Sequence, residues 1–352
     1  MNLWSQRMLL AVLCSLQTAL VIGQAATHSA LTPVPREGQW MDRHHSFNEK
    51  VQANQGQIDL VFIGDSITQG WERRGRLVWE SYYAHRKALN LGIGGDRTQH
   101  VLWRLDHGNL EGIHPKVAVL MIGTNNSKDD RNTANEMVDG VRAVVAKLRA
   151  KIPKTKLLLL AIFPRGMEFN PQRGKILQVN QAISRLHDGE SVFYRDIGAS
   201  FLSDNGVISP SIMPDSLHLS TAGYGIWANA IESFVSKHLG DTPIEIDPAA
   251  VAGDWTFEIE GPNGMSEARM NLRSDRAMLD GWIKMGPDRE LAFKSGGRFK
   301  DHLHFQIVRD RPQGGYMTYD FTGTVKVDRI RGEVTAKVEG ETTTIAWEAR
   351  RR

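Results

Sequence analysis

Short apolar runs alternate with longer stretches of helical period between about residue 60 and residue 239, and this alternation limits the possible folds more than any other feature. The apolar runs, which we predict to be strands, are residues 60–63, 88–91, 117–122, 156–162 and 191–196. The stretches with apolar side chains at helical spacing are residues 71–84, 98–105, 134–150, 176–187 and 222–239. Strands that alternate with helices form a mostly parallel sheet covered on both faces. We therefore predict an α/β fold for this part.

The chain of 352 residues is long enough for two domains. Five strands in about 180 residues suit a flavodoxin-like three-layer α/β/α sandwich, which we place at residues 40–240. Residues 241–248 carry two prolines and no apolar periodicity, and we interpret them as a linker. Residues 249–352 show short alternating runs separated by turns, which predicts an all-β barrel or sandwich as a C-terminal accessory domain.

The first 26 residues have the pattern of a secretory signal peptide: Arg7, an apolar run, and small residues before the expected cleavage site. Polar residues interrupt the run before it reaches the roughly 20 apolar residues of a membrane span. We expect a secreted or periplasmic protein with no stable membrane anchor after signal removal. The only cysteine, Cys14, lies in this segment, so the mature chain has no disulfides. A net charge of +3 without a Lys/Arg block does not indicate nucleic-acid binding.

The stretch that ends the first predicted strand is a candidate for catalysis. Leu60 to Ile63 are apolar, and Gly64-Asp65-Ser66 then turns the chain at the carboxyl end of the strand, where open α/β sheets bind ligands. Ser66 could be a nucleophile. Taken alone it is more readily a helix N-cap, since serine is a favoured residue at that position.

Three further polar or glycine-rich turns fall at the ends of other predicted elements. They are Asn90 to Asp96, which contains Gly95; Gly123-Thr124-Asn125; and Asp215-Ser-Leu-His218 before the last helix. Each has an ordinary structural alternative: a glycine turn, an Asx turn or a surface histidine. Together they provide the parts of an acyl-transfer site, namely a serine, a base that takes its proton, an acid that orients the base, and donors for an oxyanion.

Four blocks in this order resemble the SGNH (GDSL) hydrolase family, most closely the platelet-activating-factor acetylhydrolase-like esterases. The blocks are Gly64-Asp65-Ser66, Gly95, Gly123-Thr124-Asn125 and Asp215-x-x-His218. The resemblance covers about residues 40–239. It implies Ser66 as nucleophile, His218 as general base and Asp215 as its orienting partner. It also implies an oxyanion hole made by the N–H groups of Ser66 and Gly95 and the side chain of Asn125.

Two details of the resemblance need comment. Asn126 stands where the usual block has an aspartate, as in the acetylhydrolase-like subgroup, and this leaves the oxyanion donors untouched. Gly94 is the alternative to Gly95, which we prefer because the family's glycine directly precedes the aspartate. The resemblance implies that no metal or other cofactor is needed, and it is compatible with a homodimer.

The C-terminal segment is less informative. Gly253-Asp-Trp255 at its start and Arg350 near its end resemble the Gly-x-Trp and terminal basic residue of lipocalin-like barrels. Trp255 is then expected to be structural. Trp282, Tyr316 and Tyr319 could form a platform that stacks on sugars, although alternating aromatics usually line a β core.

The sequence therefore predicts a secreted serine esterase that hydrolyses short-chain acyl esters, with acetyl on carbohydrate as the preferred substrate. The expected partners are a small ester or an acetylated glycan. Two alternatives stay open. One is a lipid or general short-chain esterase similar to the platelet-activating-factor acetylhydrolases. The other is a catalytically idle protein that binds a glycan. The sequence features do not choose the leaving alcohol.

Overall fold

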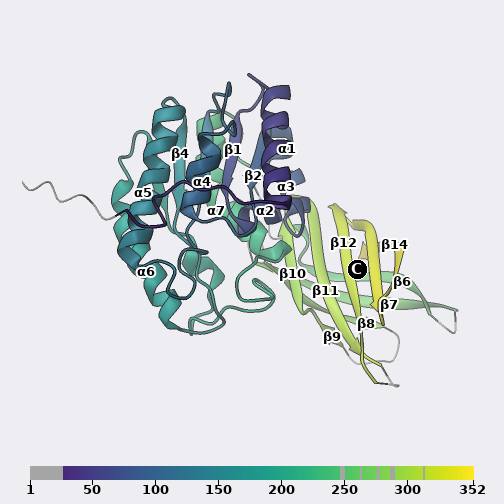
Figure 1. Cartoon of the computed structure of the whole chain (residues 1–352). Coiled ribbons are helices and arrows are strands. Elements are labelled where there is room, and N and C mark those ends of the chain that lie inside the picture. The colour runs from purple at the N-terminus through teal and green to yellow at the C-terminus, as the bar shows by residue number, and fades with distance from the viewer. Residues whose placement is uncertain (1–26, 246–249, 262–263, 276–277, 286–289, 312–313) are drawn as a thin grey trace, which may run out of the picture.

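A computed structural model describes residues 27–245, 250–261, 264–275, 278–285, 290–311 and 314–352 (Figure 1). The predicted signal peptide at residues 1–26, with Cys14, lies outside the described residues, as does part of the predicted linker. An α/β domain comes first along the chain, and an antiparallel β domain follows it.

The first domain is built on a five-stranded parallel sheet, as predicted. Its strands are β1 (Leu60–Gly64), β2 (Ala88–Gly92), β3 (Val117–Met121), β4 (Lys156–Leu160) and β5 (Val192–Arg195). They lie in the order β2-β1-β3-β4-β5 with parallel pairing throughout. This is the flavodoxin-like order, in which the order of the strands along the sheet reverses between β1 and β3. Residues that follow these two strands are therefore brought together at the carboxyl edge of the sheet.

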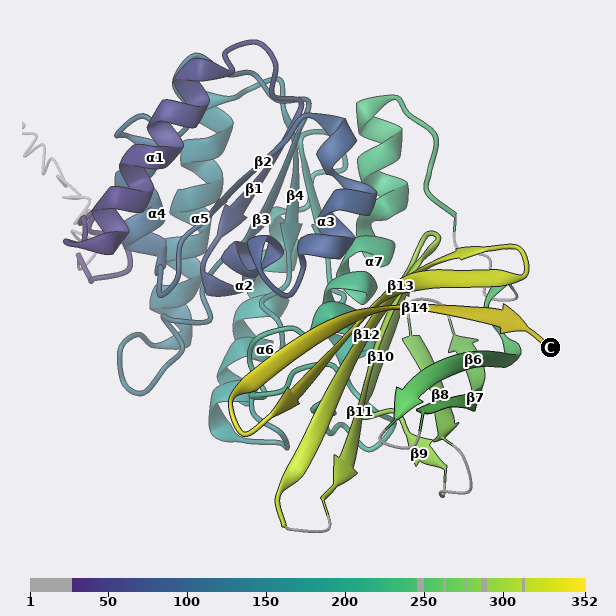
Figure 2. The same ribbon diagram turned by 90° about the vertical axis from the view of Figure 1, so that its right-hand side faces the viewer.

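Helices cover both faces of this sheet (Figure 2). The α-helices are α1 (Gln39–Ala53), α2 (Ser66–Gln69), α3 (Arg76–Tyr82), α4 (Thr98–Leu105), α5 (Ala134–Lys151), α6 (Pro171–Ile183) and α7 (Thr221–Leu239). Short 3-10 turns are η1 (Gly70–Glu72), η2 (Ala84–Arg86), η3 (Ser184–Leu186) and η4 (Gly198–Phe201). One buried apolar cluster joins the sheet to α1, α4, α5 and α6, and a second joins it to α2, α3 and α7. None of the helices in the described ranges is both long and apolar enough to span a bilayer.

One helix prediction was wrong. The helix expected at residues 71–84 is broken into η1, α3 and η2. The break falls before Gly75, where a Cβ would lie 2.9 Å from the Trp71 Cα and 2.9 Å from the Tyr224 ring. The chain turns here so that Trp71 can pack against Tyr224 of α7, with ring centroids 4.5 Å apart. Tertiary packing has thus overridden the helical pattern.

The second domain is an antiparallel sheet that closes on itself. Its strands are β6 (Gly253–Gly261), β7 (Gly264–Asp275), β8 (Met278–Met285), β9 (Leu291–Ala292), β10 (Ser295–Phe299), β11 (His302–Asp310), β12 (Tyr316–Lys326), β13 (Arg329–Val338) and β14 (Glu341–Arg351). The order runs β10-β11-β12-β13-β14-β6-β7-β8-β9, and β10 also pairs with β8, which closes a barrel. The all-β prediction is confirmed. The barrel encloses a third apolar cluster that includes Trp255, Phe305 and Phe321.

The pairing of Trp255 with a terminal basic residue is present, but with a different arginine. The guanidinium carbon of Arg351, not Arg350, lies 4.5 Å from the centroid of the buried Trp255 ring. Arg351 also donates to the carbonyls of Ala252 and Ala250, at 2.7 and 2.6 Å. In the antiparallel register Arg351 faces Trp255, so the alternation of strand faces directs Arg350 the other way.

The barrel packs against the first domain through β10 (Figures 1 and 2). A Cβ at Gly297 would lie 2.8 Å from the Ala222 Cα in the first turn of α7. The segment after α7 is also tied down. Buried Arg86 donates to both carboxylate oxygens of Glu232, at 2.7 Å each, and to Asp241 at 2.8 Å. Glu232 in turn accepts a hydrogen bond from the Ile244 N–H at 2.8 Å.

Candidate active site

Ser66 lies where β1 gives way to α2, at the carboxyl edge of the sheet. Asp65 is the N-cap of α2, and its Oδ1 accepts from the Ile67 N–H at 3.0 Å. Ser66 is therefore the first helical residue, and its N–H belongs to the first turn, whose amides have no partner within the helix. The cap that the sequence suggested for Ser66 is made by Asp65 instead. The Ser66 hydroxyl is thus free for another contact.

That contact is with a histidine from the loop before α7. The Oγ of Ser66 lies 2.9 Å from Nε2 of His218, and Nδ1 of His218 lies 2.7 Å from Oδ2 of Asp215. The His218 backbone N–H donates to the other Asp215 oxygen at 2.7 Å, which fixes the carboxylate beneath the ring. Partial burial acts to raise the pKa of Asp215, but the hydrogen bonds from His218 outweigh it and hold this pKa below its usual value. The structure thus joins three of the predicted residues in one hydrogen-bonded chain.

The proposed oxyanion donors come from loops at the same edge of the sheet, where a Cβ at Gly94 would lie 3.8 Å from the Ser66 Cβ. Gly95 has φ +78°, a conformation that favours glycine, and no acceptor in the described part of the chain pairs with its N–H. The Gly94 N–H is already used, since it donates to Oε1 of Gln69 at 2.7 Å. Asn125 donates one amide hydrogen to the Asp96 carbonyl at 2.9 Å and keeps the other available. This geometry favours Gly95 over Gly94 as the backbone donor.

A buried ion pair that we did not predict supports the Gly95 turn. The Asp96 carboxylate accepts from Nε1 of Trp40 at 2.6 Å and from Nε of Arg104 at 2.8 Å. Arg104 also donates to the Gly64 carbonyl at 3.0 Å. Both charged side chains are inaccessible to solvent. The pair therefore ties the end of β1, which precedes Ser66, to the loop that carries Gly95.

Asp65 is a second residue that sequence reasoning left without a role. Its side chain is fully buried, and its Oδ2 has no hydrogen-bond partner within the described residues. Burial raises the pKa of Asp65 to about 7, although the hydrogen bond from Ile67 acts in the opposite direction. At neutral pH this carboxyl group, on the residue directly before Ser66, is divided between its charged and uncharged forms.

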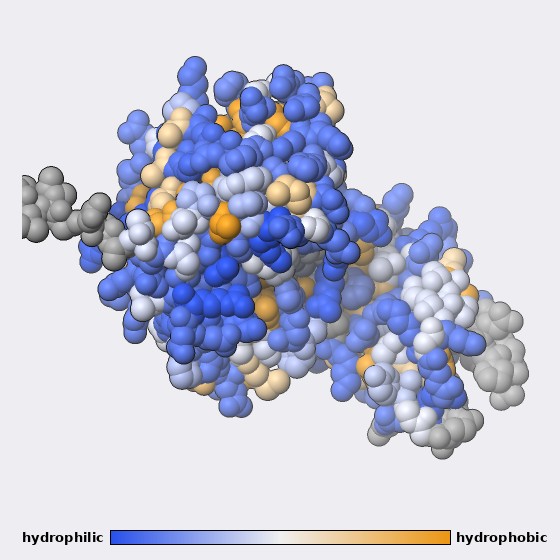
Figure 3. Space-filling model, viewed as in Figure 1, coloured by the Kyte–Doolittle hydropathy of each residue, from blue (hydrophilic) through white to orange (hydrophobic). Residues whose placement is uncertain are grey.

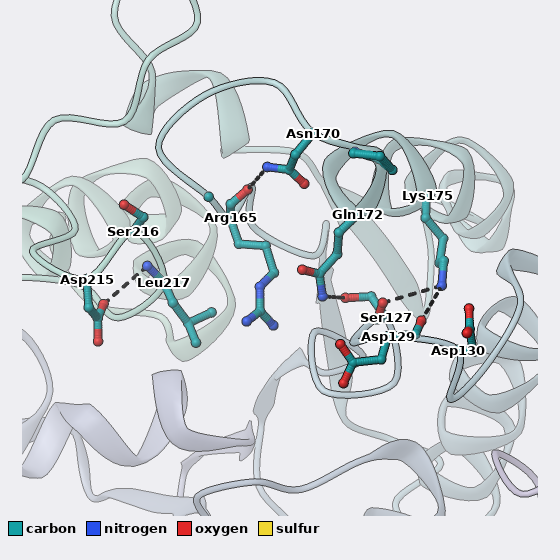
Figure 4. A pocket seen from close by; sticks show the side chains of 12 residues that line it. Ser127, Asp129, Asp130, Arg165, Asn170, Gln172, Lys175, Asp215, Ser216 and Leu217 are labelled. Atoms are coloured by element: carbon teal, nitrogen blue, oxygen red, sulfur yellow. Dashed lines mark hydrogen bonds between the residues drawn. The ribbon is translucent and has the colours of Figure 1, made fainter.

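Two pockets meet at Asp215. The smaller, of about 320 Å³, contains Ser66 and His218 and is also lined by Arg73, Arg74 and Tyr224. The larger, of about 730 Å³, lies between the loop of Asp215 and the loops after β3 and β4 (Figure 4). Figure 4 shows the Arg165 side chain between the Asp215 loop and the group around Ser127. Two adjoining spaces, one of which contains Ser66, thus meet at the loop of Asp215.

Known proteins are similar to this chain over its first domain. Residues 62–226 match the model of the GDSL-like lipase/acylhydrolase family, a range that contains Ser66, Gly95, Asn125, Asp215 and His218. The human platelet-activating factor acetylhydrolase IB subunit alpha2 is 36% identical over 222 residues, which are 63% of this chain and 94% of that protein. The human alpha1 subunit is also 36% identical, over 61% of this chain and 90% of that protein. The chain belongs to the GDSL-like lipase/acylhydrolase family. It is a serine ester hydrolase.

Two solved chains are similar to about half of this chain. A chain titled a putative platelet activating factor from Streptococcus pneumonia matches 55% of this chain and 92% of its own length, with 24% identity and a TM-score of 0.49. An acetyl-xylooligosaccharide esterase from Geobacillus matches 55% of this chain and 99% of its own length, with 20% identity and a TM-score of 0.42.

Proposed function

We propose that this protein is a secreted esterase that removes acetyl groups from carbohydrate, using Ser66, His218 and Asp215 as its catalytic triad. The observation that carries the proposal is the unbroken chain of hydrogen bonds from Ser66 Oγ through His218 to Asp215, with distances of 2.9 and 2.7 Å. A serine hydroxyl becomes a nucleophile when a neighbouring base accepts its proton. A catalytically idle binding protein has no need of this arrangement.

In the proposed reaction Ser66 Oγ forms a bond to the ester carbonyl carbon while His218 Nε2 takes the hydroxyl proton. Asp215 stabilises the resulting imidazolium and keeps the ring oriented. The N–H groups of Ser66 and Gly95 and the Asn125 amide donate to the oxyanion. The tetrahedral intermediate expels the alcohol, which receives the proton from His218. Water then adds to the acyl-Ser66 by the same steps and releases the acid. Only the neutral imidazole can accept the first proton.

The choice of acetyl follows from the relatives, whose names are those of acetylhydrolases. The choice of carbohydrate rests on the predicted signal peptide and on the barrel that follows the catalytic domain. A lipid ester is the second candidate, since the relatives' name refers to platelet-activating factor. The sugar-stacking platform that the sequence suggested has no support so far. Within the described residues no ring contact joins Trp282, Tyr316 and Tyr319, and Tyr319 packs against the barrel core.

The decisive experiment compares the wild-type protein with Ser66→Ala on 4-nitrophenyl acetate, 4-nitrophenyl octanoate and acetylated xylan. We expect wild-type turnover on the acetate and acetate release from the glycan. Ser66→Ala should lower kcat by several orders of magnitude. Ser200→Ala, a substitution of an exposed serine in η4, is the matched control and should leave kcat unchanged.

Three results would redirect the proposal. Hydrolysis at near wild-type rate by Ser66→Ala would remove Ser66 from the site. Octanoate cleavage equal to acetate cleavage, without glycan activity, would favour the lipid or general esterase. Glycan binding without serine-dependent turnover on any ester would favour the idle binding protein.

A further inference from the structure

Arg165 joins two loops of the candidate site that lie far apart in the sequence. Its Nη1 donates to the carbonyl oxygen of Thr124 at 3.1 Å and to the Thr124 hydroxyl at 3.2 Å. Thr124 is buried and directly precedes Asn125, the proposed side-chain donor of the oxyanion hole. Arg165 is half-buried on the loop after β4, and Thr124 is on the loop after β3. The arginine side chain therefore bridges two neighbouring strand ends (Figure 4).

The backbone beside Arg165 contacts the loop that carries the proposed acid and base. The Gly166 N–H donates to the Ser216 carbonyl at 2.8 Å. Ser216 lies between Asp215 and His218 and has a φ of 57°, a left-handed conformation that is uncommon for residues other than glycine. Residues 165 and 166 therefore connect both loops of the candidate site, one through its side chain and the other through its backbone.

The contacts of the Arg165 guanidinium are unusual for a cation. Within the described residues it is hydrogen-bonded to neutral acceptors and forms no ion pair, and the nearby Asp215 is bonded to His218 instead. Burial lowers the pKa of the guanidinium, while the charges of Asp65, Asp129 and Asp215 act to raise it. Burying a cation without a paired carboxylate costs free energy. A charged donor, however, holds its acceptor more firmly than a neutral donor does.

The Asn125 side chain needs such support. Its amide donates to the Asp96 carbonyl at 2.9 Å, and this single hydrogen bond does not by itself fix the orientation of the amide group. An oxyanion donor is effective only when it is held at the place where the negative charge develops. The peptide that joins Thr124 to Asn125 must therefore be held as well, and Arg165 contacts that peptide through its carbonyl oxygen.

We propose that Arg165 is a positioning residue of the Ser66 site: it fixes the Thr124 peptide and thereby keeps the Asn125 amide directed at the oxyanion. The inference rests on the proposed function, because Asn125 has this task only if Ser66 attacks an ester. Arg165 then acts through Asn125 and contributes to the rate of the chemical step rather than to the binding of the ester.

The kinetic test is a double-mutant cycle on 4-nitrophenyl acetate. Loss of one oxyanion donor typically lowers kcat about 10²- to 10³-fold, and we expect this of Asn125→Ala. Arg165→Met, which keeps an apolar stem, should lower kcat at least roughly tenfold with KM nearly unchanged. The double variant should be no slower than Asn125→Ala alone, because Arg165 has no separate effect once the amide is gone.

Two further variants separate positioning from general support of the fold. Arg165→Lys keeps a cationic donor and should be faster than Arg165→Met when Asn125 is present, but not in the Asn125→Ala background. Arg185→Met, a substitution of an exposed arginine in η3, is the matched control and should keep the wild-type kcat.

A spectroscopic measurement that needs no turnover lets this inference and the proposed function fail separately. In nuclear magnetic resonance spectra of protein with isotope-labelled asparagine, the Asn125 side-chain signal is identified by its absence from Asn125→Ala. It should shift and broaden in Arg165→Met and stay in place in Arg185→Met. Near wild-type kcat in Ser66→Ala would contradict the proposed function and leave this result standing. An unchanged Asn125 signal in Arg165→Met, or losses of kcat that multiply in the double variant, would overturn the inference.

Discussion

At the scale of single residues, Asp65, which directly precedes the proposed nucleophile Ser66, links the candidate site to the stability of the fold. Its carboxyl group has no access to water, and one of its oxygens has no partner in the described residues. Burial raises its pKa from the usual 3.8 to about 7. Between about pH 4 and pH 7 the folded protein therefore keeps a proton that the unfolded chain has lost. Rising pH then favours the unfolded state across this window.

We predict that Asp65→Asn removes this pH dependence. The difference in the free energy of unfolding, variant minus wild type, should increase by up to roughly 4 kcal/mol between pH 4 and pH 7. Above about pH 8 this difference should stay constant. Asparagine keeps an oxygen acceptor for the Ile67 N–H. Urea unfolding at pH 4.5, 6 and 8 measures the difference, with Asp204→Asn on an exposed loop as the control. A difference that does not change with pH would contradict the raised pKa.

The candidate site shows what residue patterns reveal and what they miss. Ser66, Asp215 and His218 were predictable because each follows or precedes a recognisable element at a fixed spacing. The pair formed by Arg104 and Asp96 was not predicted. The two residues are eight positions apart, and this spacing does not indicate that both side chains are buried or that Arg104 contacts Gly64. The hydrogen bond from Arg36 to the Gly94 carbonyl was not predicted either, because the segment of Arg36 contains prolines and no periodicity.

At the scale of elements, α7 couples the barrel to the catalytic loop. Ala222 in its first turn is four residues from His218 and packs directly against Gly297 of β10. The sequence of β10 gives little sign of a strand. Its two adjacent glycines have low strand propensity, yet their missing side chains are what allow β10 to approach α7 and β8 closely.

We predict that Gly297→Val impairs catalysis although residue 297 does not line the pocket around Ser66. The new side chain must displace the first turn of α7 and with it the loop that holds His218. The value of kcat/KM should fall roughly 10- to 100-fold, because small displacements of catalytic groups have effects of this size. Far-ultraviolet circular dichroism should stay that of a folded protein. Gly174→Ala, on α6 where a Cβ meets open space, is the control. Unchanged kcat/KM in Gly297→Val would show that β10 does not position the loop.

At the scale of the whole molecule, the exterior is mainly hydrophilic in the view of Figure 3, where hydrophobic residues appear in small separate groups. The contact between the domains is held by α7 with β10 and by the ties on the segment after α7. Arg86 is central to those ties, since it holds Glu232 and Asp241 at once. Glu232 also holds the backbone of Ile244.

We predict that Arg86→Met frees the segment after α7. Glu232 would remain buried without its cation, which typically costs about 3–5 kcal/mol. Cleavage after Glu245 by a glutamyl endopeptidase under native conditions should then be at least roughly tenfold faster than in wild type, since local opening governs such cleavage. Arg142→Met, on the exposed face of α5, should be cleaved at the wild-type rate. A wild-type rate in Arg86→Met as well would show that the segment is held by other contacts.

The long sequence separation between Ser66 and His218 has a consequence for biosynthesis. A ribosome adds the serine about 150 residues before the histidine, and α7 comes after both. While those residues are added, the nascent chain carries the proposed nucleophile without its proposed proton acceptor. Under the proposed mechanism a product truncated before residue 218 is inactive, so esterase activity requires a chain that has been made almost through the whole first domain.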